Sequence, residues 1–133
     1  MSLLLDTSVA IAMRERDAAT LARLVGKGTT PAISLLTVVE LEGGIAGPPD
    51  DRQRRRTALD ALLDDLDIVD FDDAVVGAYR NIIAAIGFSR RRVIDRLIAA
   101  TAIVHGLTLV TSNGADVRGI PDLKLEVWPA PGQ

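Results

Sequence analysis

Two aspartates follow short apolar segments that are predicted to be buried β-strands. Asp6 comes directly after Leu3-Leu4-Leu5, and Asp116 comes a few residues after the segment from Leu107 to Val110. In open parallel sheets with helices on both faces, functional groups gather beyond the carboxyl ends of the strands. Both carboxylates are therefore predicted to lie at one edge of the same sheet.

Two further acids belong to predicted helices. Glu40 lies at the start of the helix that follows the predicted strand from Pro31 to Ser34. Asp95 lies near the start of an apolar helix, on the same face as Ala99 and Ala102. Because alanines let a helix approach a sheet closely, this face would direct Asp95 toward the end of the sheet. An isolated charge is costly to bury there, so Asp95 needs a partner.

Carboxylates gathered at one site repel one another, and a divalent cation removes that repulsion. Mg²⁺ and Mn²⁺ favour oxygen ligands and usually retain several water molecules. Such an ion can activate water and orient a phosphate, while a carboxylate helps to remove a proton. The sequence has no cysteine, which excludes thiolate ligands, and its one histidine, His105, is predicted to interact with the last carbonyls of a helix. These features favour phosphodiester hydrolysis at an oxygen-ligated metal site.

The elements that must position these acids alternate along the chain. Predicted strands cover residues 3–5, 31–34, 68–71 and 107–110, with a weak one at 126–128; predicted helices cover 9–13, 18–25 with Gly26 as its stop, 37–41 and onward, 51–66, 74–86 and 93–105. Short buried strands that alternate with helices indicate a three-layer α/β fold, with a parallel sheet covered on both faces. A length of 133 residues suits a single domain over 1–133.

The charge pattern limits the partners of the protein. A net charge of −3 argues against a protein that coats nucleic acid by bulk attraction. One basic cluster, Arg52 with 54–56, is predicted to be solvated. The other comprises Arg90, Arg91, Arg92 and Arg96, and it lies beside Asp95, where arginines could hold RNA phosphates. The first residues lack a basic region and their apolar run is too short for a signal peptide or membrane span, so a cytoplasmic protein with no membrane partner is expected.

Four segments together resemble the PIN-domain proteins, and specifically the VapC toxins of bacterial toxin–antitoxin pairs. The matching segments are Leu4-Leu5-Asp6-Thr7-Ser8-Val9, the segment from Ile33 to Leu41 with Gly44 after it, Asp95 to Ala102, and Leu109 to Asp116. Each segment is only modestly specific, but their order and spacing are strong. The resemblance covers nearly the whole chain.

This resemblance implies a site and an activity. It implies that Asp6, Glu40, Asp95 and Asp116 form an acidic metal site, with Ser8, Thr111 and Asn113 as polar support. It also implies an endoribonuclease that depends on Mg²⁺ or Mn²⁺, cuts RNA, is commonly a homodimer and is inhibited by a cognate antitoxin. The family's sheet has the order 3-2-1-4-5. The run Arg90-Arg91-Arg92 is a departure, since relatives often have a less basic approach to this helix, and it puts the substrate preference in doubt. An antitoxin contact is an alternative role for the cluster around Arg54.

Each acid also has a purely structural interpretation. Thr37 and Glu40 have the spacing of a capping box, which would satisfy the first backbone amides of a helix. Asp6 could cap a helix after a strand, and Asp116 could belong to a turn. Asp95 could form an ordinary salt bridge with Arg91 or Arg92.

Two other functions compete with the ribonuclease. A strand that ends in Leu-Leu-Leu-Asp is similar to the nucleophile motif of haloacid-dehalogenase phosphatases. Those enzymes usually need a second aspartate two residues later, where this chain has Ser8. The non-enzymatic alternative is a metal-binding or interaction domain without turnover, which the presence of all four acids disfavours.

Overall fold

The computed structural model describes residues 2–131, and in this part of the chain five strands form one parallel sheet. The strands are β1 (Leu3–Leu5), β2 (Ala32–Ser34), β3 (Asp67–Val69), β4 (Thr108–Thr111) and β5 (Lys124–Val127). Their order is β3-β2-β1-β4-β5, and every neighbouring pair is parallel. The predicted fold class and strand order are confirmed.

Six α-helices connect the strands of the described chain. They are α1 (Thr7–Arg14), α2 (Ala18–Lys27), α3 (Leu35–Gly43), α4 (Arg52–Asp64), α5 (Asp73–Ile86) and α6 (Val93–His105). Short 3₁₀ turns precede or follow some of them: η1 (Gly44–Ala46), η2 (Pro49–Asp51), η3 (Arg90–Arg92) and η4 (Gly114–Val117). Among residues 2–131, none of these helices combines the length and apolar character needed to cross a bilayer.

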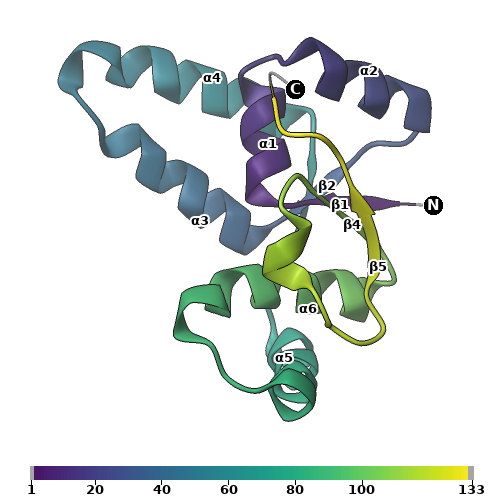
Figure 1. Ribbon diagram of the computed structural model, residues 1–133. Coiled ribbons are helices and arrows are strands. Elements are labelled where there is room, and N and C mark those ends of the chain that lie inside the picture. Colours follow the sequence, from purple (N-terminus) through teal and green to yellow (C-terminus); the bar gives the residue numbers. More distant parts are fainter. Residues whose placement is uncertain (1, 132–133) are drawn as a thin grey trace.

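The sheet lies between two apolar cores. Figure 1 shows α1, α2 and α4 on one side of the sheet and α5 and α6 on the other. Leu3 and Leu5 point into the first core, and Leu4 points into the second. This alternation follows from the two-residue period of a strand. On the second side, Ala99, Ala100 and Ala102 of α6 are fully buried, so α6 packs closely on the sheet.

Helix α3 begins earlier than its sequence predicts. Its N-cap is Ser34, whose side-chain oxygen accepts from the amide of Leu36 at 3.0 Å. Thr37 is therefore an interior residue of the helix, and its side chain is fully buried. The capping-box interpretation of Thr37 and Glu40 is wrong, because Ser34 is the N-cap of α3 and the carboxylate of Glu40 accepts from Thr7 instead.

Several other boundaries also differ from prediction. Helix α2 does not stop at Gly26; it continues to Lys27 and ends at Gly28, whose φ of 69° is the left-handed conformation that glycine adopts most readily. Strand β5 begins two residues before the predicted weak strand, because it pairs with β4 along its whole length. Of the predicted domain over 1–133, residues 1, 132 and 133 lie outside the described part.

Candidate active site

Three of the four predicted acids line one small hollow at the carboxyl ends of β1 and β4. They are Asp6, Asp95 and Asp116, and the walls are formed by Ile98, Leu109, Thr111 and Val117. Asp6 directly follows β1, Asp116 lies in η4 after β4, and Asp95 lies in the first turn of α6. The three carboxylates come from segments far apart in sequence, and the parallel sheet brings them to one edge.

Asp6 is the most firmly held of these acids. Its Oδ1 accepts hydrogen bonds from the hydroxyl of Ser8 at 2.6 Å and from the amide of Val9 at 3.1 Å. Its Oδ2 accepts from the hydroxyl of Thr111 on β4. The predicted capping role of Asp6 is therefore confirmed, since Asp6 is the N-cap of α1. The same bonds orient its carboxylate toward the hollow, so capping does not exclude ligand binding.

Polar residues after β4 extend this network. The hydroxyl of Ser112 donates to Ser8 at 2.9 Å, and the amide of Asn113 donates to the hydroxyl of Thr111 at 3.0 Å. The Nδ2 of Asn113 donates to Oδ2 of Asp116 at 2.6 Å. Each of the three residues expected to give polar support thus contacts one of the acids directly, and Ser112 joins them.

Glu40 lies apart from the hollow walls, on the exposed side of α3. Its Oε1 accepts a hydrogen bond of 2.5 Å from the hydroxyl of Thr7, which also shares a 3.1 Å hydrogen bond with the buried hydroxyl of Thr37. Sequence reasoning missed Thr7. Its signal was its position directly after the strand-terminal Asp6, where α1 starts and its side chain can reach a neighbouring helix.

Burial and neighbouring negative charges disfavour the ionised form of Asp95. Its pKa is raised to about 6, mainly by burial and then by the charges of Asp116, Glu40 and Asp6, while Arg92 acts in the opposite direction. The charges of the other three predicted acids therefore all act on Asp95. Within the described residues Asp95 forms no ion pair, so the predicted salt bridge with Arg91 or Arg92 is absent.

The donor set of the site fits a hard divalent cation. The charged groups that could bind a metal ion there are carboxylates, whose oxygens Mg²⁺ and Mn²⁺ prefer as ligands. A bound cation would also relieve the repulsion that the other acids exert on Asp95. Across residues 2–131, no three acidic or histidine side chains are already drawn together around one point. An ion that keeps several of its waters does not require such a closed cage.

Residues 3–123 match the family model described as the PIN domain. The chain belongs to the PIN-domain family.

Two comparisons place this PIN domain among VapC-type proteins, as its motifs predicted. It is 32% identical over 109 residues to Ribonuclease VapC2 of Rickettsia felis, covering 79% of each chain. Its fold matches a crystal structure of VapBC2 from Rickettsia felis bound to a promoter DNA fragment, with a TM-score of 0.82, 28% identity and coverage of 96% of this chain and 99% of that one. A DNA-bound VapBC from Salmonella typhimurium, at 24% identity, has the same fold with a TM-score of 0.80 over 96% and 98% of the two chains.

The four arginines predicted to bind RNA have different surroundings in this PIN domain. Arg90 and Arg91 are exposed, whereas Arg92 is half-buried and its Nε lies 3.9 Å from Oδ1 of Asp116. Arg96 is buried, with 6% of its surface exposed, and its Nη1 donates to the carbonyl of Gly87 at 2.9 Å. The RNA-binding role of Arg96 stays a prediction, which its buried guanidinium and its hydrogen bond to the backbone do not favour. On α6, Arg96 instead holds the loop that leads into η3.

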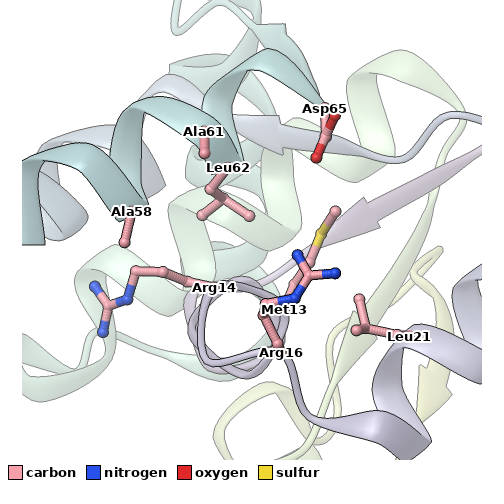
Figure 2. A pocket seen from close by; sticks show the side chains of 8 residues that line it. All are labelled: Met13, Arg14, Arg16, Leu21, Ala58, Ala61, Leu62 and Asp65. Carbon is pink, nitrogen blue, oxygen red and sulfur yellow. The ribbon is translucent and has the colours of Figure 1, made fainter. Parts of the chain in front are cut away.

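A second concave surface of the PIN domain lies between α1, α2 and α4, which cover one side of the sheet (Figure 2). Its lining combines apolar and charged side chains: Met13, Leu21, Ala58, Ala61 and Leu62 with Arg14, Arg16 and Asp65. In Figure 2, Arg14 extends toward Ala58 of α4, and Arg16 lies beside Met13. Sequence reasoning did not predict this pocket, because its residues come from three helices that only the fold brings together.

Proposed function

We propose that this protein is an Mg²⁺- or Mn²⁺-dependent endoribonuclease and the toxin of a toxin–antitoxin pair. The observation that carries the proposal is the meeting of Asp6, Asp95 and Asp116 in one hollow at the carboxyl ends of β1 and β4. The raised pKa of Asp95 supports it, because it marks a concentration of negative charge that a cation would neutralise. The likeness to Ribonuclease VapC2 of Rickettsia felis supports ribonuclease activity.

Each residue then has a defined task. Asp6, Asp95 and Asp116 would hold the cation, and Glu40 would add a ligand through water or accept a proton from the attacking water. Ser8, Thr111 and Asn113 fix the carboxylates of Asp6 and Asp116 by hydrogen bonds. When bound, the cation would activate water and stabilise charge on the phosphate. The exposed Arg90 and Arg91 lie in η3, directly before the helix that carries Asp95, and they suit contacts to RNA phosphates.

The partners proposed for the protein are RNA, a cognate antitoxin and a second copy of the chain. Solved relatives are complexes of VapB with VapC, which supports an antitoxin partner. The pocket of Figure 2 suits a segment that presents apolar side chains together with acidic ones, since its apolar floor is flanked by Arg14 and Arg16. A homodimer would cover exposed apolar side chains such as Val39, which is 63% exposed, and light scattering on the purified protein tests it. We propose the cytoplasm, where RNA is translated, as the place of action.

The decisive experiment measures RNA cleavage with added Mn²⁺, Mg²⁺ or EDTA. We expect the wild-type protein to cut RNA internally with either cation and to be inactive in EDTA. Asp95→Asn should lower the rate by at least about a hundredfold without unfolding the protein, because a metal ligand is lost. Asp64→Asn is the matched control, since Asp64 is an exposed acid at the end of α4.

Two results would contradict the proposal. Undiminished cleavage by Asp95→Asn would refute the assigned active site. Cleavage in EDTA would refute the dependence on a metal ion. Binding of Mn²⁺ by calorimetry without any RNA cleavage would favour instead a metal-binding domain that lacks turnover.

A further inference from the structure

Arg92 is the one member of the basic run in η3 that turns toward the acids. Arg90 and Arg91 are exposed, whereas only 32% of the Arg92 side chain is exposed. Its Nε is buried and lacks a hydrogen-bond partner among residues 2–131. A buried N–H group without a partner is costly, so the position of Arg92 has to be explained by another interaction.

The charged neighbour of that Nε is Asp116. The two groups form an ion pair in which Nε lies 3.9 Å from Oδ1, which is beyond hydrogen-bonding distance. The other oxygen of Asp116 accepts from Asn113 at 2.6 Å. Both oxygens of Asp116 are thus engaged, one firmly by Asn113 and one loosely by Arg92.

Arg92 also acts on the hollow as a whole. Its positive charge opposes the repulsion that Asp95 receives from the other three acids. In the described part of the chain, Asp116 has no other ion pair, and Asp95 has none at all. Within residues 2–131, Arg92 is therefore a cation that both pairs with Asp116 and acts on Asp95.

We infer that Arg92 is an internal counter-ion of the carboxylate site, which holds Asp116 in the metal-free protein and competes with the divalent cation for it. A cation that binds at the hollow meets the repulsion of a guanidinium close by, and it takes Asp116 away from Arg92. The loose 3.9 Å contact permits this exchange, because no strong hydrogen bond has to break. Arg92 is in this sense a positioning residue that lowers metal affinity. The inference rests on the proposed metal site.

Calorimetric titration with Mn²⁺ alone, at neutral pH and without RNA, tests the competition. We expect Arg92→Gln to bind Mn²⁺ about threefold to tenfold more tightly than the wild-type protein, because one unit charge near the ion is lost in a partly solvated site. Arg92→Lys keeps the charge and should stay near the wild-type affinity. The control is Arg118→Gln, since Arg118 is an exposed arginine two residues after Asp116 that forms no ion pair within residues 2–131.

A double-mutant cycle in the metal-free protein tests the pairing with Asp116 by a readout that needs no metal. Arg92→Gln should lower the urea midpoint of unfolding in EDTA, and the loss should shrink in the Asp116→Asn background. Equal losses in the two backgrounds would overturn the pairing.

Three calorimetric results remain distinguishable. Unchanged or weaker Mn²⁺ binding by Arg92→Gln would overturn the competition, and so would equal tightening by Arg118→Gln. If neither the wild-type protein nor Arg92→Gln binds Mn²⁺, the proposed metal site fails and the competition fails with it, while the cycle with Asp116 still decides the counter-ion role.

Discussion

The hydroxyl of Thr7 donates a 2.5 Å hydrogen bond to Oε1 of Glu40 and so joins the first turn of α1 to α3. Glu40 lies on the exposed side of its helix, where a glutamate side chain has several free rotamers. The bond from Thr7 selects one of them. Because α1 also carries Ser8 beside Asp6, the same helix start orients acids from two different elements.

Replacing Thr7 tests whether the hydrogen bond from Thr7 to Glu40 contributes to RNA cleavage. We expect Thr7→Val to slow Mn²⁺-dependent RNA cleavage about fivefold, since one hydrogen bond contributes about 1 kcal/mol. Thr7→Ser keeps the hydroxyl and should retain most of the rate. Single-turnover cleavage measures both variants, and circular dichroism confirms that they fold. A wild-type rate in Thr7→Val would show that the bond has no part in catalysis.

The raised pKa of Asp95 predicts how the metal-free protein responds to pH. The folded state binds a proton at Asp95 with a pKa of about 6, above its ordinary value of 3.8. Folding is therefore favoured by protonation, and this contribution is lost as the pH rises from about 4 through 6. The loss should be about 1 kcal/mol after allowance for solvent screening at this half-buried group.

Urea unfolding in EDTA at the two ends of that range measures the effect. Asp95→Asn should lose less stability than the wild-type protein over the same range, and Mn²⁺ should protect the wild-type protein at the higher pH. Identical pH dependence in the two proteins would contradict the assignment to Asp95.

Arg96 should matter for stability. Its guanidinium donates to the carbonyl of Gly87 inside the fold, and its stem packs against buried neighbours. We expect Arg96→Ala to lower the free energy of unfolding by about 2 kcal/mol, because it leaves a carbonyl without its partner and removes packed side-chain atoms. Arg91→Ala, at an exposed position of the same run, should change it by less than about 0.5 kcal/mol. Similar losses in both variants would refute this distinction.

The pocket of Figure 2 predicts where a partner chain binds. Ala61→Arg adds a long cationic side chain to a pocket that Arg14 and Arg16 also line, and it should weaken binding of the proposed antitoxin at least about tenfold. RNA cleavage by the free toxin should remain. Ala85→Arg, on α5 in the opposite layer, is the control. Surface plasmon resonance with the purified antitoxin measures both, and unchanged binding by Ala61→Arg would place the partner elsewhere.

Much of the architecture was predictable from local patterns. The apolar run Leu3-Leu4-Leu5 indicated a buried strand, and the alanine-rich face of α6 indicated close packing on a sheet. Asp6 and Asp116 were predicted to meet because they follow strands that end at one edge. These inferences succeeded because the period of a strand or helix depends only on neighbouring residues.

Helix boundaries were less predictable, since more than one residue nearby can cap a helix. Ser34 and Thr37 are both good caps by type, and Gly26 and Gly28 are both good stops. In the structure, Ser34 is the N-cap of α3 and Gly28 is the C-cap of α2. Thr37 is needed in the interior, where its hydroxyl meets Thr7, and this requirement comes from a residue thirty positions away.

The sequence by itself thus determined which acids could share a site, because strand ends and helix faces follow from short-range spacing. Only the tertiary structure decided how they are held: the bond from Thr111 to Asp6 spans 105 positions, and that from Thr7 to Glu40 spans 33. It also turned Arg92 toward Asp116 and Arg96 into the core, although both belong to one basic stretch. The direction of a long side chain depends on the packing of distant elements around it, and spacing along the chain does not contain that information.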